Sequence, residues 1–241
     1  MKMNNTKEHT THKDKFIPNI IYEDNHLLVI NKPGGMLSQG DQTGDASIVD
    51  MYKHYLKKKY NKPGNVFLGL VHRLDRPVSG VMVLAKTGKA LSRLTGQFRE
   101  KTIEKYYYAL VKTKPPLPAQ QLEHYLLKNR KQNKSYVNKT SGKEAKKAVL
   151  DYKTVGASDN YHLLKVRLLT GRHHQIRCQL AHIGCPVKGD LKYGFPRSNP
   201  DGGISLHAGE LEITHPVSKE RKVFTAPFPD GDIWHLFKHF I

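Results

Sequence analysis

Short apolar runs with strand-like alternation recur along the 241-residue chain, and Gly, Pro, Asp and Asn separate them. We predict strands over residues 20–22, 27–30, 67–71, 81–85, 105–111, 148–155, 161–169, 204–208 and 211–213. Apolar residues spaced three and four apart predict helices over 47–60, 89–99, 173–182 and 233–237. Many short strands with few helices predict an α+β fold with a predominantly antiparallel sheet.

The connecting segments suggest one ordered domain. Residues 1–15 are polar and without periodicity, which predicts a disordered tail, and order should begin near Phe16. Residues 31–35 predict a mobile loop, and the Pro-rich stretch 114–118 predicts a loop within the domain 16–241. Residues 128–147 hold eight Lys or Arg and one Glu, which predicts a flexible basic segment that either contacts RNA or is a solvated loop.

Charge narrows the class of partner. The chain holds 40 Lys and Arg against 21 Asp and Glu, a formal net charge of +19. Such an excess favours a polyanion, most simply nucleic acid, with a membrane surface as the other candidate. No apolar run approaches the roughly 18 residues of a spanning helix, and the first residues lack the apolar core of a signal peptide. The chain's only two cysteines form no disulfide framework, so we expect a reducing cytoplasm.

The stretch 71–80 places the carboxylate of Asp75 between Arg73 and Arg76, directly after an apolar run. Neighbouring cations favour the ionised carboxylate. Taken alone, a charged surface turn is the better explanation of this pattern, because surface ion pairs are common. Arg76 has no assigned role.

Two further clusters carry possible chemistry. Arg172, His173, His174 and Arg177 gather at a predicted helix start, which is suited to a phosphate or a carboxylate, or is simply a solvated helix end. In the run 106–108, alternation along a strand sends Tyr107 to one face and its neighbours to the other. For any single tyrosine, core packing is the more common role.

Familiar cofactor signatures are absent from the sequence. It contains no GxxxxGK[ST], GxGxxG or GxSxG pattern. Cys178, His182 and Cys185 are too few for a structural zinc site, and we expect neither metal nor cofactor.

Taken together, the motifs resemble the RluA-type family of RNA pseudouridine synthases over about residues 20–229. The family's HRLDxxTSG pattern matches residues 72–80, with Val78 where Thr is usual, and this exchange puts a local hydrogen bond in doubt. The KxYxAL pattern matches 105–110, and GRxHQIRxxLAHxGxPxxGDxxYG matches 171–194. The closing segment resembles 206–208, 215–216 and 226–227.

The resemblance implies a pseudouridine synthase fold with a central cleft and cofactor-free isomerisation of uridine. It makes Asp75 the essential residue, which attacks the ribose or removes its C2′ proton, and Arg177 the cation beside it. It implies that Tyr107 stacks on the uracil and takes part in the final proton removal. Leu206 is expected to line the base pocket.

RNA contacts are expected from the basic residues. By the resemblance, Arg73 fills the gap left by a flipped nucleotide. We expect further RNA contacts from Arg172, His174, Lys131 and Lys134. The short polar start leaves no room for the extra N-terminal RNA-binding domain of many family members, so we expect a monomeric catalytic domain that acts on ribosomal or transfer RNA.

Two alternatives remain at this point. The first is a non-catalytic RNA-binding or ribosome-assembly protein on the same fold, against which the presence of Asp75, Tyr107 and Arg177 argues. The second is a glycoside or nucleoside hydrolase using Asp75, which the single obvious carboxylate and the positive charge disfavour. No residue indicates which RNA or which uridine is modified.

Overall fold

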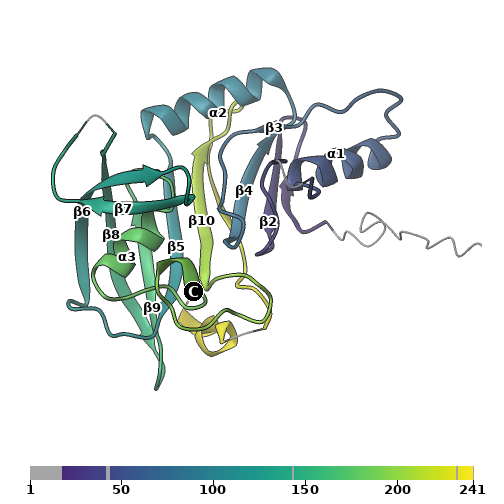
Figure 1. Cartoon of the computed structure of the whole chain (residues 1–241). Coiled ribbons are helices and arrows are strands. Elements are labelled where there is room, and N and C mark those ends of the chain that lie inside the picture. The colour runs from purple at the N-terminus through teal and green to yellow at the C-terminus, as the bar shows by residue number, and fades with distance from the viewer. Residues whose placement is uncertain (1–17, 42–43, 143, 232, 241) are drawn as a thin grey trace, which may run out of the picture.

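The computed structural model describes residues 18–41, 44–142, 144–231 and 233–240. The predicted tail and the predicted start of order at Phe16 lie outside these residues. Within the described part, eleven strands form one sheet, most of it in the order β1-β2-β4-β10-β5-β9-β8-β6-β7 (Figure 1). The strands are β1 (Ile20–Glu23), β2 (Leu27–Lys32), β3 (Gly69–Leu70), β4 (Ser79–Ala85), β5 (Glu104–Val111), β6 (Ala119–Asn129), β7 (Lys134–Asn138), β8 (Lys146–Ala157), β9 (His162–Leu168), β10 (Leu206–Thr214) and β11 (Arg221–Thr225).

Strand pairing in the sheet is antiparallel except between β4 and β10. The prediction of an α+β fold with a mainly antiparallel sheet is confirmed. The parallel pair places Gly80 opposite Ala208, and a Cβ at Gly80 would overlap the Ala208 backbone. Gly80 also has φ +119°, so this close approach requires glycine. The close contact between Gly80 and Ala208 joins β4, the strand after Asp75, to β10, the strand that begins at Leu206.

Two of the predicted helices match the structure closely. α1 (Ile48–Lys59) begins at Ser47, whose Oγ accepts a hydrogen bond from the Asp50 amide, and it buries Tyr52 and Leu56. α2 (Gly88–Glu100) is capped in the same way by Thr87. Both helices follow the apolar spacing of their sequences because one face of each is buried.

The third predicted helix, 173–182, is shorter in the structure. α3 (Gln175–His182) starts two residues later, because His174 has φ +51° and cannot continue a right-handed helix. The helix lies against β6 and β7 (Figure 1).

The basic segment 128–147 is partly regular rather than one continuous loop, because its ends lie in β6 and β8 and residues 134–138 form β7. Its contact with RNA stays a prediction. β6 runs to Asn129 and pairs with β7 over five residue pairs, from Tyr125–Asn138 to Asn129–Lys134. The Ser135 amide donates to the Tyr193 hydroxyl at 2.8 Å, which ties β7 to a distant segment. The pairing therefore depends on contacts far away in the sequence, which local composition does not reveal.

Three smaller differences concern strand limits. The strand predicted over 67–71 is only β3, and Phe67 is 50% exposed. The two strands predicted between 204 and 213 form the single strand β10, and β11 was not predicted. The first two residues of the loop predicted as mobile over 31–35 belong to β2, and the side chain of Lys32 is fully buried and hydrogen-bonded.

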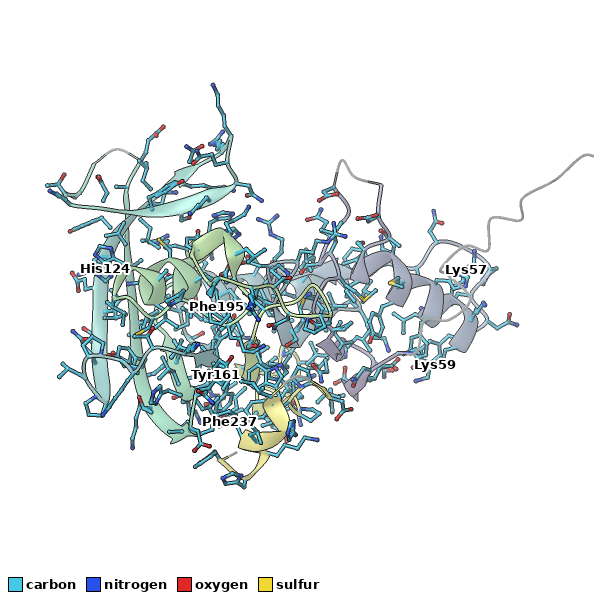
Figure 2. The ribbon with its side chains drawn as sticks, turned by 60° about the horizontal axis from the view of Figure 1, so that its bottom comes forward. Lys57, Lys59, His124, Tyr161, Phe195 and Phe237 are labelled. Carbon is cyan, nitrogen blue, oxygen red and sulfur yellow. The ribbon has the colours of Figure 1, made fainter. Side chains whose placement is uncertain are left out.

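The C-terminal residues form a 3₁₀ helix, Trp234–Phe240, where a short helix was predicted. Figure 2 shows Phe237 of this helix in the same part of the molecule as Tyr161. Phe237 is fully buried in a hydrophobic cluster separate from the main core, which also contains Tyr108, Leu110, Leu163, Phe228 and Trp234. None of the helices in the described ranges is long and apolar enough to cross a membrane.

Candidate active site

The predicted site residues that carry chemistry line one cleft of about 860 Å³. Its walls come from the loop before β4, from β5 and β10, and from the segment that leads into α3. The lining includes residues 37–41, 72–78 and 171–177 together with Tyr107, Lys128, Lys192 and Leu206.

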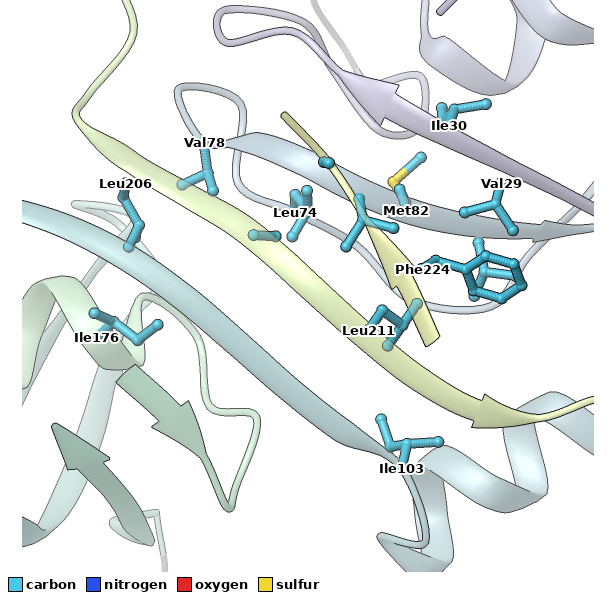
Figure 3. Packing of buried hydrophobic residues seen from close by; sticks show 14 of the residues in the cluster. Val29, Ile30, Leu74, Val78, Met82, Ile103, Ile176, Leu206, Leu211 and Phe224 are labelled. Atoms are coloured by element: carbon cyan, nitrogen blue, oxygen red, sulfur yellow. The ribbon is translucent and has the colours of Figure 1, made fainter. Parts of the chain in front are cut away.

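The loop that carries Asp75 is anchored on both sides of the carboxylate. Leu74 and Val78 are 5% and 3% exposed and belong to the main core cluster, which also includes Leu206 and Ile176 (Figure 3). The Ser38 hydroxyl donates to the Leu74 carbonyl at 2.7 Å. Val78, which departs from the family pattern, fills an apolar position, so the lost hydroxyl is replaced by core packing. The anchoring holds Asp75 at the cleft surface.

The buried side chain of Lys32 anchors the same loop. Its ammonium group donates to the carbonyls of Pro33, Met36 and Arg76 at 2.9, 2.8 and 3.1 Å. Burial lowers the pKa of Lys32 to about 7, against the opposing effect of the Asp75 charge. The sequence analysis assigned no role to this residue, and a Lys before Pro-Gly-Gly gives no local sign of burial.

Asp75 faces a buried arginine. Nη1 of Arg177 donates to Oδ2 of Asp75 at 3.1 Å, and the two side chains are 5% and 29% exposed. Nε and Nη2 of Arg177 donate to the two carboxylate oxygens of Asp190 at 2.7 and 2.9 Å. Burial alone would lower the pKa of Arg177, but the bonds and charge of Asp190, and then those of Asp75, raise it. A fixed positive charge therefore lies beside Asp75.

His174 lies against the same carboxylate, where we predicted an RNA contact. Its side chain is 6% exposed, and Nε2 is 3.6 Å from Oδ2 of Asp75. Nδ1 is 3.0 Å from the Tyr193 hydroxyl. Burial, and then the charge of Arg177, lower the pKa of His174 to about 2, so the ring is neutral. A ring this buried is better placed to act on Asp75 than to meet RNA.

Tyr107 and Leu206 form one side of the cleft. β5 pairs with β10 so that Tyr107 is opposite Ala208 and Ala109 is opposite Leu206, which puts Tyr107 and Leu206 on one face. The structure confirms the predicted alternation, because Tyr108 points into a different core cluster. Burial, and then the charge of Asp75, raise the pKa of Tyr107, so its phenol is protonated near neutral pH.

Some of the predicted RNA-binding residues line the cleft and others lie outside it. Arg73 is exposed at the cleft, and Arg172 also lines it, with Nε donating to the Lys147 carbonyl at 2.9 Å. Lys131 is exposed outside the cleft lining, and Lys134 lies over the rings of Tyr136 and Tyr193 at 5.3 and 5.1 Å.

Two other lysines, Lys128 and Lys192, line the cleft although the sequence analysis did not select them. Their positions follow from the β6–β7 hairpin and from the segment after α3, both of which fold back toward Asp75.

His72, next to Arg73 in the motif, has a structural role. Its Nε2 accepts a hydrogen bond from the Val83 amide at 3.1 Å, and its ring stacks on Phe98 with centroids 4.8 Å apart. Burial, and then the charge of Lys105, lower the pKa of His72 to about 3. The neutral ring thus fixes the start of the Asp75 loop against β4.

The comparison with known proteins agrees with this geometry. Residues 26–182 match the model of the RNA pseudouridylate synthase family. The chain belongs to this family. Membership confirms the predicted RluA-type resemblance and the class of the protein, an RNA pseudouridine synthase of the isomerase type.

Curated relatives include ribosomal large subunit pseudouridine synthase C of Buchnera aphidicola (34% identical; 90% of this chain, 69% of the relative). The synthase C of Vibrio vulnificus is 35% identical over 86% of this chain and 65% of its own length. Ribosomal large subunit pseudouridine synthase D of Zymomonas mobilis is 33% identical over 91% of this chain and 71% of its own length. The chain thus spans about two thirds of the length of these relatives.

Solved structures confirm the fold. Human RNA pseudouridylate synthase domain containing 4 superposes with a TM-score of 0.74, covering 92% of this chain and 90% of that protein at 24% identity. Human RNA pseudouridylate synthase domain containing 1 gives a TM-score of 0.69 over 88% and 84% of the two chains, also at 24% identity.

Besides the cleft lysines Lys128 and Lys192, sequence reasoning missed Asp190, Tyr193 and Lys32. Asp190 and Tyr193 are part of the quoted GDxxYG pattern, so the signal was present without a role attached to it. Their function in the cleft is visible only once α3 and the segment after it fold together.

Proposed function

We propose that this chain converts uridine to pseudouridine in large-subunit ribosomal RNA, with Asp75 as the catalytic residue. The observation that carries the proposal is the ion pair between Asp75, at the surface of the cleft, and the buried Arg177. The names of the curated relatives support the choice of RNA.

The reaction is an isomerisation and needs no oxidant or reductant. The bond between C1′ of the ribose and N1 of uracil breaks, the uracil turns over, and C5 bonds to C1′; C5 loses its proton and N1 takes one up, so that no atom is gained or lost. Asp75 starts the reaction by attacking the ribose or by removing the C2′ proton. In either role it needs a free ionised oxygen, and among the described residues Oδ1 of Asp75 has no hydrogen-bond partner.

Arg177 would pair with that carboxylate and orient it. Asp190 accepts two hydrogen bonds from one edge of the guanidinium, so the group cannot turn away from Asp75. A charge fixed before the substrate arrives costs no reorganisation during the reaction.

Tyr107 and Leu206 would hold the uracil. The Tyr107 ring offers a stacking face beside Asp75, and Leu206 adds an apolar wall. Because the phenol is protonated, we assign stacking to Tyr107 in the resting cleft. A later role in removing the C5 proton requires the phenol to lose its own proton first.

The RNA would have to present its uridine unstacked, at a cost of a few kcal/mol. Arg73, exposed at the cleft, can stack in the vacated position. The other basic residues at the rim would hold the phosphates.

A genetic experiment tests the proposal. Pseudouridines in ribosomal and transfer RNA are mapped with and without the gene, and the gene is restored as wild type, Asp75→Ala or Asp151→Asn. Asp151 is a matched carboxylate on β8, outside the cleft. We expect wild type and Asp151→Asn to restore the lost sites in large-subunit RNA and Asp75→Ala to restore none. Restoration by Asp75→Ala would leave the non-catalytic RNA-binding alternative.

We also propose that the chain acts as a monomer in the cytoplasm. A single chain supplies Asp75, Arg177 and Tyr107 to the cleft, so no second copy is needed to complete it. An RNA substrate and two cysteines without a disulfide fit a reducing compartment. Sedimentation equilibrium with and without RNA measures the oligomeric state.

A further inference from the structure

We propose that His174 is a positioning residue for Asp75: its Nε2–H is held toward Oδ2 by a hydrogen-bond chain from Ser135 through Tyr193. This inference rests on the proposed function of Asp75. It gives His174 a task distinct from the RNA contact expected from the sequence.

The tautomer of His174 follows from the donors around it. The Ser135 amide donates to the Tyr193 oxygen at 2.8 Å. The Tyr193 hydroxyl is 3.0 Å from Nδ1 of His174, and this nitrogen is the acceptor that its own hydrogen can reach. We therefore assign Nδ1 as the acceptor of the Tyr193 hydrogen, which in the neutral ring leaves the proton on Nε2, facing the Asp75 carboxylate.

Neutrality of the ring has independent support. Burial and the charge of Arg177 lower the pKa of His174 to about 2. A protonated ring would place a second cation beside Arg177, whose charge already faces Asp75. A neutral N–H adds direction to the carboxylate without adding charge.

Nε2 is 3.6 Å from Oδ2, which is too long for a hydrogen bond in the free protein. Catalytic hydrogen bonds in unliganded structures are commonly long and shorten in the substrate complex. A shift of a few tenths of an ångström of the Asp75 side chain would bring Oδ2 into range of both Arg177 and His174. Oδ1 would then remain free to act on the ribose.

The backbone at His174 fits a functional role. His174 has φ +51°, in the left-handed region that only a few per cent of non-glycine residues adopt, with Asn, Asp and His over-represented among them, and its side chain makes no capping bond to α3. The ring instead stacks on His173, with centroids 3.8 Å apart, and meets Tyr193 edge to face. Strained residues of this kind cluster at functional sites.

Two substitutions separate positioning from a purely structural role. His174→Gln keeps an N–H donor near the place of Nε2, whereas His174→Asn keeps a polar group near Nδ1 but reaches no further. The left-handed backbone favours Asn over Gln. A structural role therefore predicts that Asn is tolerated better, and the positioning role predicts that Gln is.

The experiment measures single-turnover tritium release from [5-³H]uridine-labelled large-subunit RNA taken from a strain without the gene. We expect His174→Asn to lower the rate about tenfold or more and His174→Gln to stay within about threefold of wild type. The dissociation constant for RNA should change in neither variant. Equal rates, or a higher rate for Asn, would overturn the inference.

The tautomer can be read directly by ¹⁵N NMR of histidine-labelled protein, with the His174 signal assigned from the His174→Gln spectrum. In the wild type we expect the tautomer with the proton on Nε2 and none on Nδ1. In Tyr193→Phe this tautomer should no longer be the main one. A protonated Nδ1 in wild type would contradict the proposal. An inactive wild-type protein would instead refute the proposed function, so the two failures are distinguishable.

Discussion

Nη1 of Arg177 lies 3.1 Å from Oδ2 of Asp75, although 102 residues separate them in the chain. The arginine is almost fully buried, while nearly a third of the carboxylate side chain remains exposed. The cation is therefore protected from solvent and the carboxylate is accessible to a substrate. This asymmetry underlies the first prediction.

Replacing Arg177 by Lys should abolish most activity although the charge is kept. A lysine cannot make paired bonds to Asp190 and still reach Asp75, so Asp190 loses part of its pairing in a buried site. We expect the single-turnover rate to fall about 10²-fold or more, and the free energy of unfolding to fall by about 3 kcal/mol. Arg99→Lys, at an exposed pair on α2, is the control and should change neither. A variant with normal turnover would show that the bidentate contact is unnecessary.

Lys32→Met should loosen the Asp75 loop. It leaves three carbonyl groups without their donor, including that of Arg76, next to Asp75. We expect the free energy of unfolding to fall by about 2 kcal/mol, measured by urea denaturation, together with a lower turnover rate. Lys57→Met, on the exposed side of α1 (Figure 2), should leave both unchanged.

RNA affinity should fall steeply with salt. A logarithmic plot of binding constant against salt concentration has a slope that reflects the number of phosphate contacts. Lys128→Ala and Lys131→Ala should each reduce that slope by about 1 if these lysines bind phosphate. Lys112→Ala, exposed on the loop after β5 and outside the cleft, should not. Unchanged slopes for all three variants would place the RNA elsewhere.

Acid should destabilise the fold through its buried histidines. Burial lowers the pKa of His174 to about 2 and of His207 to about 4, so both are neutral in the folded chain at pH 5. In the unfolded chain they bind protons near pH 6.5. The free energy of unfolding should therefore fall as the pH drops from about 6.5 toward 4.5, by up to about 1.4 kcal/mol per pH unit for each histidine.

Urea unfolding at pH 7, 6 and 5 measures this slope. His207 accepts from the Ser79 hydroxyl through Nδ1 and donates to the Ala226 carbonyl through Nε2. His207→Gln should lower the free energy of unfolding at pH 7. It should also make the dependence of that free energy on pH less steep, by the contribution of one histidine. An identical slope in the variant would mean that His207 is not the group that titrates.

The predicted elements that survive are those whose pattern is local. α1 follows the spacing of its apolar residues and ends at caps visible in the sequence, Ser47 among them. The alternation of Tyr107 and Tyr108 correctly assigned them to opposite faces of β5. Local periodicity predicts burial because the residues that face the core of a helix or strand recur at the period of that element along the chain.

The predictions that failed depend on distant partners. The β6–β7 hairpin is rich in basic residues, and Tyr193 and His173 hold it through Ser135. The burial of His174 depends on a left-handed backbone turn that its neighbours do not signal. Neither feature has a local signature.

The sequence by itself determined the family and the type of fold and led to the proposal for Asp75, because several long motifs of the family occur in this chain in the family's order. Only the tertiary structure decided what surrounds Asp75. Arg177, Asp190 and His174 reach it from one segment of the chain, and Lys32 supports its loop from another. Electrostatic forces and hydrogen bonds act over a few ångströms of space, and sequence separation does not reveal which residues will be that close.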